Sequence, residues 1–251
     1  MNNTSFHLNN KTILVTGASS GIGRQVAISA SRMGATVIIT GRNEERLNAT
    51  FKELETKESQ QFLADLQDNS GLELFVEGLP EPDGIVHCVG IVKPFPIKYI
   101  SIEKINETFD VNYNVQLTLM AQIARKKKLK RNASIVFSSS ISAAHPHKGG
   151  ALYAGSKAAL EIFSKTLVLE FSHLKIRSNC LASAMVKTPM YDYAQNQASK
   201  EQMDKHVEKY PLGVGLPDDV ANAAIFLLSD ASRWITGQTI TLDGGFLLGD
   251  F

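Results

Sequence analysis

The chain has 251 residues, of which 43% are hydrophobic and 20% are charged, and its formal net charge is +1. This composition is that of an ordinary globular protein, and the small net charge excludes a general attraction to nucleic acid or to a membrane surface. Because α/β chains of this length often stay undivided, we expect one domain covering residues 1–251.

Neither the N-terminus nor the cysteines suggest export. The opening residues MNNTSFHLNN lack the charged and apolar regions of a secretion signal, and no run approaches the ~18 apolar residues of a membrane span. Cys88 and Cys180 lie in apolar runs, so two buried free thiols are expected rather than a disulfide. We therefore expect a cytoplasmic protein that has no membrane or nucleic-acid partner and no metal site.

Short apolar runs alternate with longer amphipathic stretches along the chain. The mostly apolar runs predict strands, and runs of this kind are typical of parallel strands that are covered on both faces. A Rossmann-type doubly wound parallel sheet between two layers of helices is therefore expected. The predicted strands are 12–17, 36–41, a third ending near 65, 84–90, 134–140, 176–182 and 238–245, and the predicted helices are 24–33, 44–57, 102–130, 151–174 and 217–229.

A glycine-rich turn follows the first predicted strand, and a helical pattern begins at once. Glycines allow a sharp turn and a close approach to a pyrophosphate, and a helix N-terminus offers amide donors and partial positive charge. The sequence therefore predicts a dinucleotide site here, as opposed to a purely structural turn. The residues concerned are Thr16, Gly17, Ser19, Ser20, Gly21, Ile22 and Gly23.

The second predicted strand ends in Gly41 and Arg42, where NAD-binding folds usually carry an acidic residue. A guanidinium can bind a 2′-phosphate that a carboxylate would repel, so NADP(H) is predicted in preference to NAD(H). The alternative is an arginine that merely starts the next helix. Asp65, with Leu66 beside it, is placed to contact the adenine, or else Asp65 is a helix N-cap.

Tyr153 and Lys157 stand four residues apart near the start of a long predicted helix, so both lie on one face. A neighbouring ammonium and an oxidised nicotinamide both favour phenolate, which would bring Tyr153 toward the working pH of a general acid and base. The pair is common by chance. Ser140 gives it weight, because this serine ends a predicted strand thirteen residues earlier and could meet the phenol over one substrate oxygen.

A serine hydrolase is the rival interpretation of a serine at a strand end. The sequence around Ser140 is not a G-x-S-x-G elbow, and no histidine is suitably placed after it. An oxidoreductase that moves a hydride between NADP(H) and a carbonyl or alcohol is therefore predicted.

With these motifs in this order, the sequence closely resembles the classical short-chain dehydrogenase/reductase (SDR) family over nearly its whole length. Residues 16–23 match the family's glycine motif, and Ser140, Tyr153 and Lys157 match its serine and its tyrosine-lysine pair. Residues 217–246 match its C-terminal segment. The pattern is most similar to that of the 3-oxoacyl-acyl-carrier-protein reductases.

The resemblance implies roles for further residues. Asn112 would hold a water of a proton relay through its backbone, and Lys157 would bind the nicotinamide ribose. Ser140 would steady the substrate carbonyl, and Val186 and Thr188 would contact the nicotinamide amide.

Two departures from the family pattern stand beside the site. The family's Asn-Asn-Ala-Gly is His87-Cys88-Val89-Gly90 here, so an asparagine that braces the sheet is missing, while contacts of Val89 and Gly90 with the cofactor remain expected. The usual Pro-Gly is Ser183-Ala184. These changes leave open a protein of another class, a catalytically silent NADP(H)-binding sensor or interaction protein.

The substrate stays open between a 3-oxoacyl thioester and another small ketone, sugar, polyol or hydroxy acid. The basic run at residues 125–131 could attract an acidic carrier protein, or it could be a solvated helix end. The irregular stretch 185–214 is expected to be a substrate lid, with a surface helix pair as the alternative. Family likeness also implies a homo-oligomer, a tetramer or dimer, to which the apolar tail 244–251 could contribute.

Overall fold

A computed structural model of the chain describes residues 4–197 and 199–249. Seven parallel strands form one sheet in the order β3-β2-β1-β4-β5-β6-β7, so the winding direction reverses between β1 and β4. This confirms the predicted doubly wound α/β fold. The strands are β1 Thr12–Thr16, β2 Thr36–Gly41, β3 Gln60–Leu63, β4 Gly84–His87, β5 Ser134–Ser140, β6 Arg177–Ser183 and β7 Thr239–Leu242.

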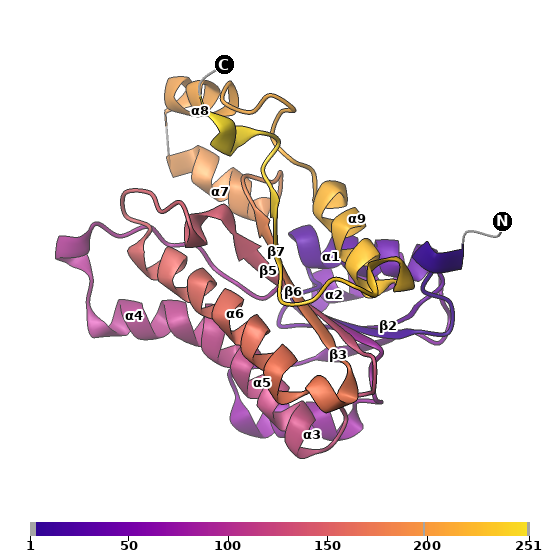
Figure 1. Cartoon of the computed structure of the whole chain (residues 1–251). Coiled ribbons are helices and arrows are strands. Elements are labelled where there is room, and N and C mark those ends of the chain that lie inside the picture. The colour runs from indigo at the N-terminus through magenta and orange to yellow at the C-terminus, as the bar shows by residue number, and fades with distance from the viewer. Residues whose placement is uncertain (1–3, 198, 250–251) are drawn as a thin grey trace.

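Helices cover both faces of the sheet (Figure 1). One apolar core lies between the sheet and α1, α2 and α9, and a second lies between the sheet and α3, α5 and α6. The central strands are buried on both faces, which explains their continuous apolar runs. The helices are α1 Gly21–Arg32, α2 Glu44–Phe51, α3 Asn69–Gly78, α4 Ile102–Phe109, α5 Val115–Arg125, α6 Ala151–Glu170, α7 Pro189–Gln197, α8 Lys200–Val207 and α9 Pro217–Leu228.

The segment predicted as one helix over 102–130 is helical from Ile102 to Arg125, but a π-helical turn interrupts it and it ends earlier than predicted. A π-helical turn at Asp110–Asn114 separates α4 from α5, and α5 ends at Arg125, shortly before Lys127 adopts a positive φ of 55°. Helices α2 and α6 also end earlier than expected, at Phe51 and Glu170. Within residues 4–197 and 199–249, no helix combines the length and apolar character that crossing a membrane requires.

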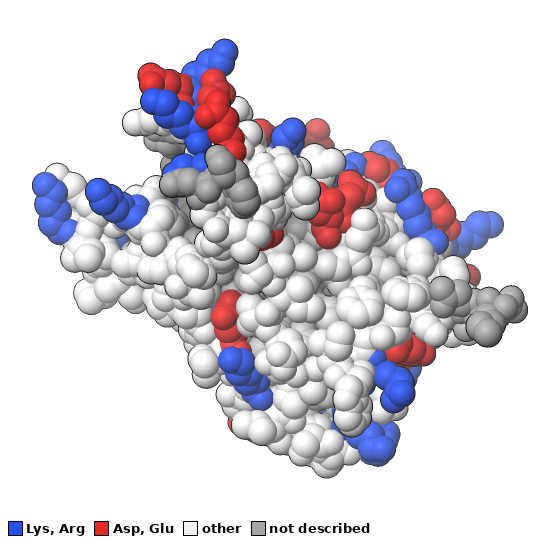
Figure 2. Space-filling view, turned by 45° about the horizontal axis from the view of Figure 1, so that its top comes forward, with Lys and Arg blue, Asp and Glu red and all other residues white. Residues whose placement is uncertain are grey.

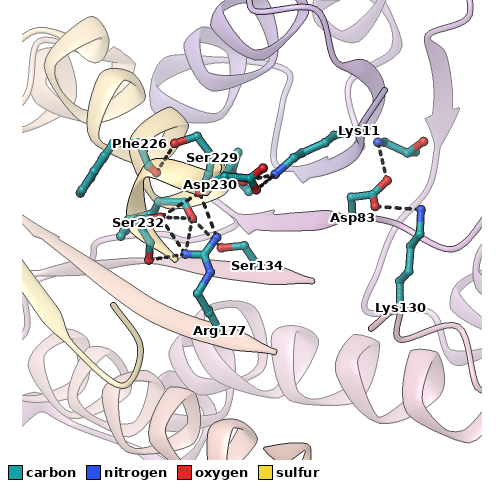
Figure 3. A network of polar contacts seen from close by, with 12 residues as sticks. Lys11, Asp83, Lys130, Ser134, Arg177, Phe226, Ser229, Asp230 and Ser232 are labelled. Atoms are coloured by element: carbon teal, nitrogen blue, oxygen red, sulfur yellow. Dashed lines mark hydrogen bonds and ion pairs between the residues drawn. The ribbon is translucent and has the colours of Figure 1, made fainter. Parts of the chain in front are cut away.

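Much of the basic run at 125–131 is engaged within the protein. The Lys126 ammonium lies 2.7 Å from a carboxylate oxygen of Glu77, and Lys128 donates to the Glu77 backbone carbonyl at 2.6 Å. Lys130 pairs with Asp83 at 2.8 Å (Figure 3). These contacts fasten the end of α3 to the end of α5, which gives the run a structural role.

Arg177, at the start of β6, binds the C-terminal end of α9 (Figure 3). Its guanidinium donates to the carbonyl oxygens of Leu227 at 2.7 Å and of Ser229 at 3.2 Å, and to Ser232 Oγ at 2.7 Å. The last carbonyls of a helix lack partners within the helix, so a cation with several donors suits them. This contact ties the end of α9 to the start of β6.

We expect Arg177→Met to lower the free energy of unfolding by about 3 kcal/mol, because several part-buried carbonyls lose a charged donor. Urea unfolding followed by circular dichroism at fixed protein concentration measures this. Arg233→Met, at an exposed arginine nearby, is the control. Equal effects of the two substitutions would contradict the structural role given to Arg177.

Candidate active site

A cavity of ≈ 880 Å³ follows the carboxyl edge of the sheet. The turn after β1 and the segment after β4 form its middle, where the winding reverses, which is the usual place for a ligand in such a fold. Both the glycine turn and the Ser140-Tyr153 region line this one cavity. The two halves of the site predicted from sequence are therefore continuous.

Two glycines in the turn after β1 are required by close contacts. Gly17 has a φ of +67°, and a Cβ there would lie 2.8 Å from the Cys88 carbonyl carbon. A Cβ on Gly23 would lie 2.4 Å from the Gly17 oxygen. Ser20 is the N-cap of α1 but its side chain does not cap the helix, so the first amides of α1 face the cavity without that acceptor. This is a cradle suited to a phosphate.

Arg42 and Arg46 lie together at one end of the cavity. The Arg42 guanidinium is 3.3 Å from Gln67 Oε1 and 3.9 Å from Asp65 Oδ2. The N-cap alternative for Asp65 was wrong, because Asp68 caps α3 by accepting from the Ser70 and Gly71 amides. Hydrogen bonds from the Ser70 hydroxyl and from these two amides lower the pKa of Asp68. Asp65 is thus free of a capping role and lines the cavity beside Arg42.

Ser140, Tyr153 and Lys157 lie at the other end. Ser140 is the last residue of β5, and Tyr153 and Lys157 belong to the first turns of α6. Lys157 Nζ donates to the Ser138 carbonyl at 2.7 Å and lies 5.7 Å from the centre of the Tyr153 ring. A substrate oxygen in this part of the cavity can reach both a serine hydroxyl and a phenol.

Burial dominates the electrostatics of this end. It raises the pKa of Tyr153, an effect that the Ser140 hydroxyl partly opposes, and it lowers the pKa of Lys157 to about 8. The expected lowering of the Tyr153 pKa by Lys157 is not what this geometry gives, since the lysine donates to a backbone carbonyl. Tyr153 is therefore a protonated phenol here, the form that can donate a proton.

Asn112 lies behind the cavity wall, in the π-helical turn. Its amide oxygen accepts from the Ile91 N–H at 2.7 Å, and its amide nitrogen donates to Ile91 O at 3.0 Å and to Ser156 Oγ at 3.1 Å. Its backbone carbonyl accepts from Gln116 Nε2 at 2.7 Å. Asn112 thus connects the segment after β4 to α6.

The sequence departure at residue 87 has a visible structural consequence. The His87 ring is buried and stacks on Phe137 at 4.6 Å, and burial lowers its pKa to about 3, so it is neutral.

Gln116 Nε2 donates to the Val89 carbonyl at 3.1 Å as well as to the Asn112 carbonyl. This glutamine links the chain after β4 to the π-helical turn.

Most of the predicted site residues line the cavity, and two do not. Thr16 and Asn112 are fully buried outside it. The lining residues are Gly17, Ser19, Ser20, Gly21, Ile22, Gly23, Arg42, Asp65, Leu66, Val89, Gly90, Ser140, Tyr153, Lys157, Val186 and Thr188.

Several residues that line the cavity were not predicted from the sequence. Arg46 could have been found, since it follows Arg42 by four residues, whereas the others come from loops and distant segments without a local pattern. They include Cys88, whose thiol pKa burial raises to about 12, and His145, His147, His206, Tyr210 and Phe246.

Comparison with known proteins agrees with a cavity that contains a glycine-rich nucleotide cradle and a Tyr-Lys pair. A family model described as Enoyl-(Acyl carrier protein) reductase matches residues 17–247. The chain belongs to the short-chain dehydrogenase/reductase family. It is 34% identical over 244 residues to the 3-oxoacyl-[acyl-carrier-protein] reductase FabG of Rickettsia felis, covering 96% of this chain and 98% of that one.

Other SDR relatives carry different names. L-xylulose reductase of Caenorhabditis elegans is 33% identical over 249 residues, covering 96% of this chain and 98% of the relative. Among solved structures, a protein of Beutenbergia cavernae assigned as an NAD(P)-dependent gluconate 5-dehydrogenase, with NADP bound at low occupancy, superposes with a TM-score of 0.85 at 28% identity, covering 98% of this chain and all of that chain. These relatives therefore share the family of this chain, and their names indicate different substrates.

We expect Lys157→Met to raise the free energy of unfolding at pH 7 by about 1–2 kcal/mol, although the lysine belongs to the predicted site. A pKa near 8 in the folded protein, against an ordinary 10.5, means that the buried ammonium destabilises the fold below pH 8. As the pH rises from 8 to 10.5 the folded protein loses this proton first, so the wild type gains stability relative to the variant. Urea unfolding across this range measures both effects, and a variant less stable than the wild type at pH 7 would contradict them.

Proposed function

We propose that the protein is an NADP(H)-dependent oxidoreductase that interconverts a carbonyl and an alcohol. The observation that carries the proposal is the single cavity that joins a phosphate cradle at α1 to Ser140, Tyr153 and Lys157. A nicotinamide cofactor, when bound, supplies or accepts the hydride. The remaining chemistry is proton transfer and orientation, which side chains can perform.

In the reduction, Tyr153 donates its phenolic proton to the carbonyl oxygen, and in the reverse reaction it takes the proton from the alcohol. Ser140 donates a hydrogen bond to the same oxygen. Lys157 binds the nicotinamide ribose and, with the backbone carbonyl of Asn112, returns protons to Tyr153 through water. In this structure that carbonyl accepts from Gln116 Nε2 at 2.7 Å, so a relay water would share it with the glutamine.

The cofactor would lie along the turn 17–23, with the pyrophosphate at the N-terminus of α1. Thr16, buried beneath this turn, would act through the backbone. Asp65 and Leu66 would contact the adenine, Val89 and Gly90 the adenosine ribose, and Val186 and Thr188 the nicotinamide amide. All except Thr16 line the cavity, which supports this assignment.

Arg42 supports the preference for NADP(H). Its guanidinium and that of Arg46 line the same end of the cavity, and a 2′-phosphate there would accept charge-assisted hydrogen bonds from both. The Asp65 carboxylate lies 3.9 Å from the Arg42 guanidinium and forms no close bidentate pair with it. The NADP named with the Beutenbergia cavernae structure agrees with this preference.

A 3-oxoacyl thioester remains one candidate substrate because the Rickettsia relative is named for it, and L-xylulose reductase represents the sugars. Binding of an acidic carrier protein receives less support from the structure, since Lys126, Lys128 and Lys130 are engaged with groups of the protein itself.

We also propose that residues 185–214 act as a lid and that residues 1–251 form one catalytic domain. This stretch contains α7 and α8, whose outer side carries charges of both signs at the top of Figure 2, and its inner side lines the cavity through Tyr191 and His206. The lid and the surface helix pair are therefore compatible, because α7 and α8 form a helix pair that also borders the proposed substrate space.

Exposed apolar side chains support a homo-oligomer, either a tetramer or a dimer. Ile162 and Leu169 on α6 are 62% and 77% exposed, and Trp234 before β7 is 91% exposed. Much of the face shown in Figure 2 is uncharged. Phe246, in contrast, packs on Tyr210, so part of the apolar tail belongs to the cavity and not to a subunit contact.

Free thiols at Cys88 and Cys180 support the cytoplasm as the compartment.

Tyr153→Phe should lower the rate of NADPH oxidation by at least about 10²-fold, because the variant has no proton to donate. The assay follows absorbance at 340 nm with a panel of ketones, sugars and 3-oxoacyl thioesters, while NADPH fluorescence checks that the cofactor still binds. Tyr99→Phe, exposed and outside the cavity, is the control. Equal activity of Tyr153→Phe and wild type would refute the mechanism, and cofactor binding without turnover of any panel member would favour a silent binding protein.

Arg42→Ala should lower the ratio of kcat/KM with NADPH to that with NADH by about 10–100-fold, since a charge-assisted bond to the 2′-phosphate is worth about 1.5–3 kcal/mol. Arg32→Ala is the matched control, because Arg32 pairs with Glu55 away from the cavity. A preference for NADH in the wild type that persists in Arg42→Ala would overturn the assignment.

A further inference from the structure

Three histidines line the substrate end of the cavity, and no motif accounts for them. His145 and His147 lie in the loop between β5 and α6, and His206 lies on α8. Of the described residues that line the cavity, the one carboxylate is Asp65, at the far end beside Arg42. The described lining of the substrate end therefore contains donors and potential cations but no carboxylate, although burial and the nearby Asp243 both raise the pKa of Tyr210 there. In the described part of the chain these histidines do not form a group that could hold a metal ion.

His147 is held beside the helix that carries Tyr153. The Gly150 amide donates to the His147 carbonyl at 2.9 Å, which closes a turn at the N-terminus of α6. The imidazole lies across Gly150, since a Cβ on this residue would be 2.7–3.0 Å from three ring atoms. Glycine at position 150 therefore makes room for the imidazole next to the first turn of α6.

His206 is held on the opposite wall by aromatic neighbours. Its Nε2 lies 3.4 Å from the Tyr210 hydroxyl, and its ring centre is 5.1 Å from that of Phe246. The Tyr210 oxygen accepts from the Met185 N–H at 3.3 Å, which leaves the hydroxyl hydrogen to donate to Nε2. In that arrangement the His206 proton resides on Nδ1, as a donor not used by Tyr210.

His206 lies close enough to His147 to be affected by its charge. Burial lowers the pKa of His206, and Lys209 and His147 lower it further. His147, His206 and Lys209 thus lie close enough to interact at this part of the cavity, and none of the described residues that line it there is a carboxylate. An anion between the two walls would be attracted by all of these groups and could accept from the histidines.

We propose that the substrate is an oxo acid, and in the reverse direction a hydroxy acid, whose carboxylate lies between His147 and His206 while its reacting oxygen lies at Tyr153 and Ser140. The inference rests on the proposed function and narrows it. A carboxylate has two acceptor oxygens, one for each wall, whereas a thioester or a sugar brings no negative charge to this position. The carboxylate takes no part in the redox step, in which the hydride from NADPH and the proton from Tyr153 convert the carbonyl to an alcohol.

The test compares acids with their uncharged esters: acetoacetate, levulinate and 5-oxohexanoate, each beside its methyl ester, with NADPH as reductant. For at least one chain length, the wild type should have a higher kcat/KM for the acid. His147→Gln and His206→Gln should each lower the acid-to-ester ratio by about tenfold or more, mainly through KM, because a bound carboxylate favours the protonated imidazole and glutamine keeps a donor but cannot take up that charge. His173→Gln, at a histidine outside the cavity, should leave the ratio unchanged.

A wild-type preference for the esters, or an acid-to-ester ratio that neither substitution changes, would overturn the inference. Turnover of the esters in that case would still support the proposed function. Binding supplies a readout that does not need turnover. In the presence of NADP⁺, hexanoate should raise the Tm more than hexanamide does, and His206→Gln should remove the difference. Equal shifts for the two compounds in the wild type would also overturn it.

Discussion

The close approach of the chain segments after β1 and β4 is the constraint on which the rest of the site depends. The backbone of Gly17 meets that of Cys88 so tightly that a single added carbon would lie 2.8 Å from the Cys88 carbonyl carbon. This contact occurs where the sheet reverses its winding, so it opens a crevice on one side and directs α1 toward it. That packing sets the position of the phosphate cradle and of Val89. It also brings Ile91 to Asn112.

The end of the cavity at Tyr153 shows how a fold tolerates an unfavourable group. Lys157 is almost fully buried, its partner is a neutral carbonyl, and the burial depresses its pKa to about 8. The large apolar cores on the two faces of the sheet offset this destabilisation. Such a group is retained in a protein when its chemistry requires the position, which is the usual conflict between stability and activity at catalytic sites.

The features that the sequence predicted well are local ones. A strand, a glycine turn and a helix follow each other directly at residues 12–32, and Tyr153 and Lys157 share one face of a helix, so spacing alone places them. The break at Asp110–Asn114 escaped because a π-helical turn needs no glycine or proline. The role of the basic run escaped for another reason, since the partners of Lys126 and Lys130 lie far away in sequence, at Glu77 and Asp83. The histidine walls come from a loop and from α8, and only tertiary structure joins them.

Cys88 has a bearing on how the site withstands oxidants. Its thiol borders the crevice where a cofactor would lie, and damage there would block it. Burial raises its pKa to about 12, which disfavours the thiolate, the form that reacts with peroxides and alkylating agents. The same packing that shapes the crevice therefore lowers the reactivity of the sulfur that borders it.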